Sequence, residues 1–444
     1  MNKAVILVGG PSRATRFRPL SMNMPQPLFP VGGKPIVWHQ VKALSKTANL
    51  KEIILLGFFE EHVFKNFLDQ CTEEFPHISF RYLREYSVLG TAGGLFHFRD
   101  LILHGNTQNV FLLYTDICSS FPLEELLQKH IESKKLGTIM ATKVCYPPPS
   151  YNTYFYTIFV PRSSASKYGC VVADKDSDLA LHYVEKPQTY VSDLASTGVY
   201  VFSSKIFNYM AEIIEERDKA RESISSKGFD SSFGANSETL RLEQDVLQKM
   251  TEDRELSIYQ TKGFWRQIKS AASAVPANAA YLIQAQKDNE SFISQPTKPA
   301  SIQNERDRSG PIIVGAVYIH PSAIVDNSAK IGPNVSIHAH VVIGAGARIK
   351  NSIVLDHTVI KDNSAILNAI IGWRGKIGRW SRVEGNPIDE ASNDVEHVTS
   401  SGIKINSICI LGQETTVNDE IFVRSSIVLP YKEISSDQHN EIIM

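Results

Sequence analysis

The chain has 444 residues, which is too long for one ordinary core and suits two or three domains. Its 46 Lys and Arg nearly balance its 47 Asp and Glu, so it lacks the broad positive field that nucleic-acid binding usually needs. Five scattered cysteines without a CxxC pair argue against a zinc site, and the apolar run before Gly9 is too short for a signal peptide or a membrane span. We therefore expect a cytoplasmic protein that binds neither nucleic acid nor membrane.

The first half of the chain alternates strand-length apolar runs with helix-length amphipathic stretches. Strands are expected at 4–8, 52–58, 80–83 and 109–114, with helices at 35–46, 61–71 and 92–104. This order predicts a Rossmann-like α/β domain with a mostly parallel sheet, whose ligands bind at the carboxyl ends of the strands. Further strands, two of them shorter, are expected at 137–144, 170–173, 182–185 and 198–202, and the Pro- and Tyr-rich stretch 146–161 is expected to be a surface insertion.

Branched residues repeat with a period of six in the last third of the chain. The first series comprises Ile319, Val325, Ile331, Ile337, Ile343, Ile349 and Leu355. The second series, four positions later, comprises Ala323, Ala329, Val335, Val341, Ala347, Ile353 and Val359. A hexad is the unit of a left-handed parallel β-helix, with each branched side chain pointing into the prism. A second phase of Ile371, Ile377 and Val383 follows a slip near Leu367.

The polar composition of 287–310 marks a linker between the two predicted domains. The domains are then 1–286, the α/β domain, and 311–444, the β-helix. The acidic and polar stretch 386–401 is expected to leave the β-helix as a loop, either as a contact with a partner or as a tolerated insertion.

The sequence after the first strand is suited to an anion. Gly9 and Gly10 allow close approach of the backbone to a ligand, and Arg13, Arg16 and Arg18 supply positive charge. Three arginines within six residues favour phosphate binding over a plain turn.

A set of motifs in chain order resembles the sugar-phosphate nucleotidyltransferases. The motifs are T-R-F-R-P-L at 15–20, P-x-P-L at 25–28, L-G-T-A-G at 89–93, Asp116 after an apolar strand, V-E-K-P at 184–187, G-V-Y at 198–200 and G-F-W at 263–265. With the hexads behind them, the resemblance covers nearly the whole chain. Within this family the chain most resembles GDP-mannose pyrophosphorylases (mannose-1-phosphate guanylyltransferases), and among those the alpha, regulatory-type subunits.

The resemblance implies roles for particular residues. In this family a sugar-phosphate oxygen attacks the α-phosphorus of a nucleoside triphosphate, without a protein nucleophile. Arg16 and Asp116 would be catalytic, with Asp116 also binding Mg²⁺. The nucleotide would contact Leu7, Gly9, Gly10 and Gly90. The sugar phosphate would contact Gly169, Glu185, Lys186 and Ser196.

Several positions depart from the family pattern. Ala14 stands where the loop has its second glycine, and Ser196 replaces an asparagine. Gln26 replaces the lysine of P-K-P, and Gln267 replaces the second metal-binding carboxylate. Because two charged groups are missing, we expect a regulatory subunit that binds GDP-mannose or GTP, transfers guanylyl groups poorly, and assembles as an oligomer with itself or with a catalytic, beta-type paralogue.

Two alternatives stay open at this point. The chain could be an active guanylyltransferase in which Arg13 or Lys34 supplies the missing charge. Alternatively, the β-helix could be an acyltransferase with a histidine as general base, the candidates being His320, His338, His340 and His357.

Overall fold

The computed structural model describes residues 1–10, 15–143, 168–174, 177–225, 239–297, 310–386, 396–398 and 404–444. Its contacts divide into two compact units. The first unit comprises 1–13 and 37–265, and the second comprises 14–36 and 266–444. A segment near the N-terminus therefore belongs to the second unit. The domains 1–286 and 311–444 remain a prediction about the sequence, and most of the expected linker, the insertion 146–161 and nearly all of the loop 386–401 lie outside the described residues.

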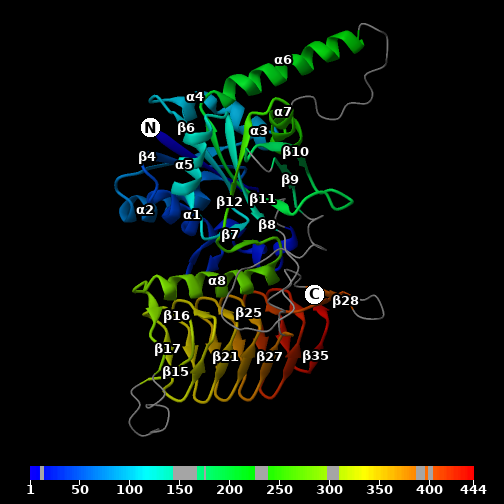
Figure 1. Ribbon diagram of the computed structural model, residues 1–444. Coiled ribbons are helices and arrows are strands. Elements are labelled where there is room, and N and C mark those ends of the chain that lie inside the picture. Colours follow the sequence, from blue (N-terminus) through cyan, green and yellow to red (C-terminus); the bar gives the residue numbers. More distant parts are fainter. Residues whose placement is uncertain are drawn as a thin grey trace. The chain divides into compact units, whose positions relative to one another are not determined.

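A twisted sheet forms the first unit (Figure 1). Its strands are β1 (Asn2–Gly9), β4 (Leu50–Gly57), β5 (Ser79–Arg84), β6 (Asn109–Tyr114), β8 (Gly137–Lys143), β9 (Cys170–Ala173), β10 (Ala180–Val184), β11 (Leu194–Ser203) and β12 (Leu256–Gln260). The order β5-β4-β1-β6 is parallel throughout, which confirms the predicted α/β core. Strand β11 runs antiparallel to both β6 and β8, so the sheet is mixed beyond β6.

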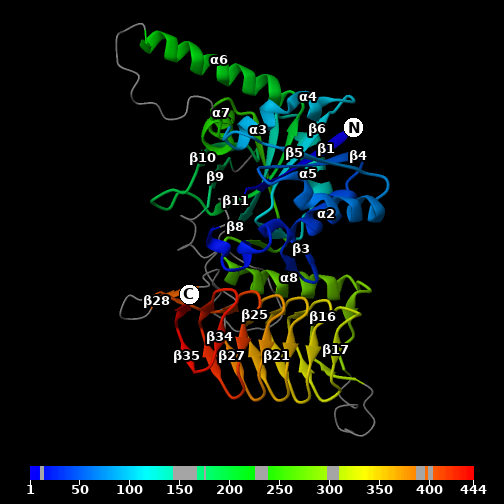
Figure 2. The same cartoon turned by 180° about the vertical axis from the view of Figure 1, so that it is seen from behind.

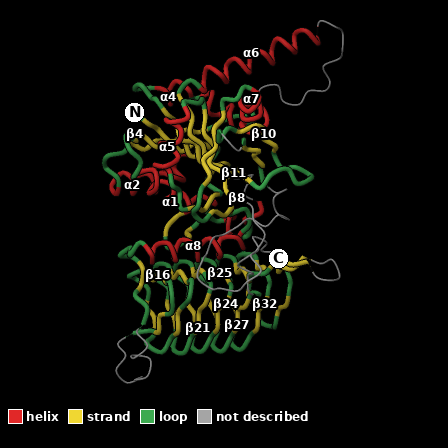
Figure 3. Tube along the Cα trace, viewed as in Figure 1, coloured by secondary structure: helices red, strands yellow, loops and turns green. Residues whose placement is uncertain are grey.

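Helices accompany this sheet, as Figure 3 shows in red. They are α1 (Ile36–Ser45), α2 (Glu61–Glu74), α3 (Thr91–His97), α4 (Arg99–Leu103), α5 (Leu123–Ser133), α6 (Ile206–Ser225), α7 (Gln248–Glu252) and the π-helical segment Leu242–Leu247. The single helix expected at 92–104 is divided at Phe98, whose ψ of 13° departs from helical geometry. The short strand β7 (Ile117–Ser119) follows β6, and β13 (Trp265–Gln267) begins at the last residue of the first unit.

The second unit is built on a left-handed parallel β-helix, which confirms the predicted fold class (Figure 2). One sheet contains β14 (Ile293–Ser294), β16 (Val317–Ile319), β19 (Val335–Ile337), β22 (Ile353–Val354), β25 (Ala369–Ile371), β30 (Cys409–Leu411), β33 (Ile427–Val428) and β36 (Ile442–Ile443). The second sheet contains β15 (Ile312–Ile313), β18 (Lys330–Ile331), β21 (Arg348–Lys350), β24 (Ala365–Leu367), β27 (Arg382–Glu384), β32 (Phe422–Arg424) and β35 (Gln438–His439). The third contains β17 (Ile324–Val325), β20 (Val342–Ile343), β23 (Val359–Ile360), β26 (Lys376–Ile377), β31 (Thr416–Val417) and β34 (Glu433–Ile434). A separate hairpin pairs β28 (Glu396–Val398) with β29 (Lys404–Asn406).

The predicted phase of the hexads is wrong from Ile353 onward. The prism core continues from Ile349 to Val354 and then to Ile360, and it does not include Ile353, Leu355 or Val359. The turn from Ile349 to Val354 has one residue fewer than a hexad, so the inward position moves by one. The same shortening between Ile366 and Ile371 produces the slip that the sequence showed near Leu367, and Ile371, Ile377 and Val383 are core residues as predicted.

An asparagine ladder lines the corner where these shortened turns occur. Asn334 donates to the Oδ1 of Asn351 at 3.1 Å, and Asn351 donates to the Oδ1 of Asn368 at 3.1 Å. All three residues have positive φ angles, between 47° and 60°. Asparagine tolerates this left-handed conformation better than other residues with a Cβ, so one residue type satisfies both the backbone and the ladder.

Beside the β-helix, the second unit holds α8 (Ala274–Lys287) and the segment 14–36, described from Thr15. The segment contains β2 (Pro30–Val31), β3 (Lys34–Pro35) and short 3₁₀ turns at Thr15–Phe17, Leu20–Met22 and Gln26–Leu28, and a further turn, Ala271–Ser273, precedes α8. Asn278 of α8 is fully buried and connects α8 to the segment 14–36 and to the β-helix. Its Oδ1 accepts hydrogen bonds from the Gly32 amide at 2.8 Å and the Ser336 hydroxyl at 2.6 Å, and the Phe29 ring lies edge-on to Trp373 at 6.2 Å.

Replacing the middle rung of the ladder tests its contribution. Asn351→Ala should destabilise the β-helix by about 1–3 kcal/mol. The substitution removes two side-chain hydrogen bonds, and alanine tolerates the positive φ at this position less well than asparagine does. Asn351→Gly is the matched control, since glycine adopts positive φ freely and loses only the ladder. Thermal unfolding of both variants separates the two contributions, and equal melting temperatures for Asn351→Ala and the wild type would contradict the analysis.

Candidate functional site

The carboxyl ends of β1 and β6 are held side by side. Thr115 donates from its amide and its hydroxyl to the Leu7 carbonyl, at 3.3 and 3.0 Å. Asp116 follows in the turn to β7 and is half-buried. The Phe58 amide donates to the Gly9 carbonyl at 2.8 Å, which adds the end of β4 to the same edge. This edge brings together four sequence-predicted residues, namely Leu7, Gly9, Gly10 and Asp116.

The L-G-T-A-G motif is fixed at the start of α3 by the backbone of Leu240. The Leu240 carbonyl accepts from the Ala92 and Gly93 amides at 3.0 and 3.1 Å, and its amide donates to the Leu89 carbonyl at 2.8 Å. Gly90 has a φ of 84°, and a Cβ there would lie 2.4 Å from the Leu240 carbonyl oxygen. Only glycine fits this position, for both conformational and steric reasons.

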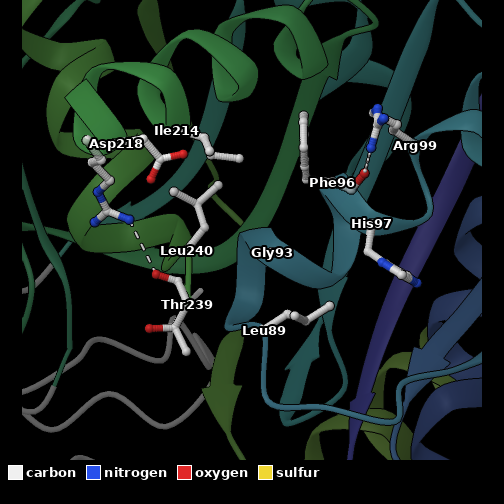
Figure 4. A pocket seen from close by; sticks show the side chains of 10 residues that line it. Leu89, Gly93, Phe96, His97, Arg99, Ile214, Asp218, Thr239 and Leu240 are labelled. Carbon is white, nitrogen blue, oxygen red and sulfur yellow. Dashed lines mark hydrogen bonds between the residues drawn. The ribbon is translucent and has the colours of Figure 1, made fainter. Parts of the chain in front are cut away.

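A hollow of about 380 Å³ adjoins this motif (Figure 4). Its lining comprises Leu89, Gly93, Phe96, His97, Arg99, Ile214, Arg217, Asp218, Thr239 and Leu240. The two guanidinium groups are engaged, because Arg217 donates to the Thr239 carbonyl at 3.3 Å and pairs with Asp245, while Arg99 donates to the Phe96 carbonyl at 3.0 Å. Leu89 and Leu240, whose backbone contact fixes the glycine turn, therefore form part of the lining of the hollow.

A second group of predicted residues surrounds Gly169. The Ser196 amide donates to the Gly169 carbonyl at 2.8 Å, and the Ser196 hydroxyl lies 3.2 Å from the Tyr200 hydroxyl. Tyr183 donates to the Glu185 Oε2 at 2.9 Å, and a Cβ on Gly169 would lie 2.1 Å from the Tyr183 hydroxyl oxygen. Glu185 also pairs with the exposed Lys186 ammonium at 2.9 Å. Gly169, Glu185, Lys186 and Ser196 are thus brought into one neighbourhood.

Three residues that the sequence did not single out, Thr91, Tyr114 and Glu243, connect the L-G-T-A-G motif to the end of β6 through hydrogen bonds. Tyr114, the last residue of β6, donates to the Oε1 of Glu243, and Thr91 donates to the Oε2 at 3.3 Å. Burial, assisted by the Glu243 charge, raises the pKa of Tyr114 well above its ordinary value, so the phenol stays a proton donor. Thr91 lies within a motif that the sequence analysis recognised, whereas Glu243 follows a stretch without a recognised motif.

Three further residues of interest belong to the second unit. Arg16 is exposed on the first 3₁₀ turn of the segment 14–36. Gln26 donates from its side-chain amide to the Ile268 carbonyl. Gln267 lies in β13 and is partly buried.

The candidate histidines of the β-helix differ in exposure. His338 is buried against the Tyr318 ring, and burial lowers its pKa to about 4. His340 and His357 are exposed and stack at 4.9 Å. His320 is partly exposed, with its Nδ1 2.8 Å from the Ser322 hydroxyl. Among the residues that the structure describes, no three His, Cys, Asp or Glu side chains come together as a metal-binding group.

Comparison with known proteins identifies the family. The nucleotidyl transferase family profile matches residues 3–151 and 149–282, and the profile described as the GMPPB C-terminal domain matches 313–443. A probable mannose-1-phosphate guanyltransferase from Schizosaccharomyces pombe is 43% identical over 447 residues, covering 100% of both chains. This chain belongs to the mannose-1-phosphate guanylyltransferase family. The motif resemblance is thereby confirmed.

Other relatives of this guanylyltransferase family member carry a more specific name. The mannose-1-phosphate guanylyltransferase regulatory subunit alpha of Xenopus tropicalis is 42% identical over 451 residues, covering 100% of both chains. Among solved structures, a putative glucose-1-phosphate thymidylyltransferase from Bacillus anthracis matches with a TM-score of 0.47 and 19% identity, covering 63% of this chain and 94% of that chain. No helix among the described residues combines the length and the apolar character that a membrane crossing needs.

The tight packing at Gly169 gives a direct test of this neighbourhood. Gly169→Ala should abolish or strongly weaken stabilisation by GDP-mannose, because the new Cβ displaces the Tyr183 hydroxyl and the Glu185 carboxylate. The measurement is the ligand-induced rise in melting temperature. Gly310→Ala is the control, since a Cβ at Gly310 meets nothing within 4 Å. An unchanged ligand-induced shift in Gly169→Ala would remove these residues from the site.

Proposed function

We propose that this protein is a regulatory, nucleotide-sugar-binding subunit in GDP-mannose biosynthesis, which binds GDP-mannose or GTP and transfers guanylyl groups weakly or not at all. The observation that carries the proposal is the neutral Gln26 side chain, which donates to the Ile268 carbonyl at the position where the family pattern has a lysine. The nucleotide would contact the edge formed by Leu7, Gly9 and Gly10 together with Gly90. The sugar phosphate would contact Gly169, Glu185, Lys186 and Ser196.

The chemistry of guanylyl transfer explains why this substitution matters. The departing pyrophosphate gains negative charge, and catalysis depends on positive groups that are already in place. Arg16 can neutralise part of that charge, but the amide of Gln26 carries none. The loss of one such group costs roughly a hundredfold or more in rate. Nucleotide and sugar recognition is assigned to backbone groups, to Ser196 and to the Glu185–Lys186 pair, none of which depends on a charge at position 26, so binding survives this loss.

Magnesium fits the proposed site only in part. Asp116 offers one carboxylate at the end of β6, and Gln267 offers an amide where the family pattern has the second carboxylate. Mg²⁺ in proteins is often held by one or two carboxylates together with substrate phosphates. We propose that Asp116 would hold Mg²⁺ with the phosphates of a bound nucleotide, where the ion would neutralise phosphate charge.

We further propose that the protein is cytoplasmic and assembles with itself or with a catalytic, beta-type paralogue. The name of the Xenopus tropicalis relative supports a subunit role. The stacked coils of a β-helix also present flat faces and open ends that suit assembly.

An activity assay tests the missing charges. The purified protein with Mg²⁺, GTP and mannose 1-phosphate should release little pyrophosphate, and the double substitution Gln26→Lys with Gln267→Asp should raise the rate by about a hundredfold or more. Gln128→Lys, on the exposed face of α5, is the control for added charge and should leave the rate unchanged. Wild-type turnover at the level of an ordinary guanylyltransferase would overturn the proposal and establish the active alternative.

Co-purification tests the partner. The full-length protein, expressed with an affinity-tagged beta-type guanylyltransferase of the same organism, should be retained in fixed stoichiometry and should change the sensitivity of that enzyme to GDP-mannose. Retention without any change in the enzyme's kinetics would reduce the role to a structural one. Failure to co-purify at micromolar concentration would contradict the proposed partner.

A further inference from the structure

Glu243 occupies an unusual place in the first unit. It lies in the first turn of the π-helical segment Leu242–Leu247, and π-helical turns are rare and occur frequently at functional sites. The segment follows Leu240, whose backbone fixes the L-G-T-A-G motif by three hydrogen bonds. Glu243 is therefore three residues from the main-chain anchor of the turn that we assign to the nucleotide.

Both oxygens of the Glu243 carboxylate accept hydrogen bonds, and the donors come from different elements. Tyr114, at the end of β6, donates to Oε1, and Thr91, in the first turn of α3, donates to Oε2 at 3.3 Å. An ionised carboxylate can only accept, so Thr91 is the donor of the second bond, and the Thr91 oxygen also accepts from the Leu242 amide at 2.9 Å. The single hydroxyl hydrogen of Thr91 is thus available for the carboxylate.

The charge of this carboxylate is not balanced by an ion pair. Within the described part of the chain, no Lys or Arg lies within ion-pair distance of Glu243. Burial and the facing Glu185 carboxylate raise the pKa of Glu243, which means that this position disfavours the charged form. A neutral residue would be more stable here if packing were the sole requirement.

We infer that Glu243 is a positioning residue for nucleotide-sugar binding, because its carboxylate ties the Gly90–Thr91 turn to the strand end that carries Asp116. The inference rests on the proposed function and deepens it. Gly90 and Asp116 belong to separate elements, and the Thr91–Glu243–Tyr114 bridge is a side-chain connection between those elements. Disrupting the bridge lets the two elements separate, so binding weakens although the bridge itself need not contact the ligand.

The bridge is expected to be sensitive to pH. The groups that face Glu243 are Thr91 of α3, Tyr114 of β6, Tyr183 of β10, Glu185 directly after β10, and Tyr200 of β11. The tyrosines have raised pKa values and remain neutral, whereas the pKa of Glu243 is raised mainly by burial. As pH falls through the raised pKa of Glu243, one of its oxygens takes up a proton and stops accepting. Affinity for the nucleotide sugar should therefore fall toward acidic pH.

The experiment compares GDP-mannose binding by calorimetry in the wild type, Glu243→Gln and Tyr114→Phe, each as the full chain. Glutamine keeps the size of the side chain but replaces one acceptor with a donor, so the Kd should rise about tenfold. Tyr114→Phe removes the other end of the bridge, and the double variant should bind no more weakly than the weaker single variant, since both changes break the same connection. The Kd of the wild type should rise as pH falls, whereas that of Glu243→Gln should change less.

Glu125→Gln is the matched control, because Glu125 accepts a hydrogen bond from Tyr259 at 2.8 Å on the exposed surface of the same unit. It should bind like the wild type. If Glu243→Gln binds GDP-mannose with the same Kd and the same pH profile as the wild type, the inference is overturned while the proposed function stands. If Glu243→Gln fails to fold, unaltered binding by Tyr114→Phe overturns the inference instead. Absence of GDP-mannose binding by the wild type would overturn the proposed function and this inference together.

Discussion

The Leu7 carbonyl, which accepts both the amide and the hydroxyl of Thr115, determines how the first unit can bind a ligand. These two hydrogen bonds hold the ends of β1 and β6 together at the edge where a parallel sheet binds its ligands. The glycines after β1 and the carboxylate after β6 take their positions from that edge, and the glycine turn before α3 is connected to it through the Thr91–Glu243–Tyr114 bridge. A displacement of either strand end would therefore disturb every group that we assign to the nucleotide.

The two units differ in the kind of interaction that they contribute. The groups around Gly169 and Glu243 are hydroxyls, carboxylates and backbone amides, which suit recognition of a sugar and a base. The segment 14–36 of the second unit instead carries the positions where the family pattern supplies cationic charge, and there Arg16 is retained while Gln26 is neutral. The proposed function therefore assigns recognition and charge neutralisation to separate parts of the fold, so that one can be lost while the other is kept.

Periodicity predicted the architecture well, because βαβ alternation and hexads reflect which faces of strands are buried. It failed at Ile353, where a turn is one residue shorter, since a period carries no information about the length of an individual corner. Gly169, Glu185, Lys186 and Ser196, which the motif resemblance implies for the sugar phosphate, lie in one neighbourhood, but the resemblance could not find Glu243. That residue is recognisable only when the chain folds back to bring Leu242–Leu247 against Thr91, and this contact joins positions 151 or more residues apart.

The burial of Asn278 between Gly32 and Ser336 has a consequence for chimeras of related chains. Because the segment 14–36 packs on α8 and on the coils, a change in one of these surfaces has to be matched by a change in the other. A chimera of two paralogues that is joined only near residue 286 would place the segment of one parent on the coils of the other. Exchanging residues 14–36 together with the C-terminal half would preserve the native pairing of these surfaces.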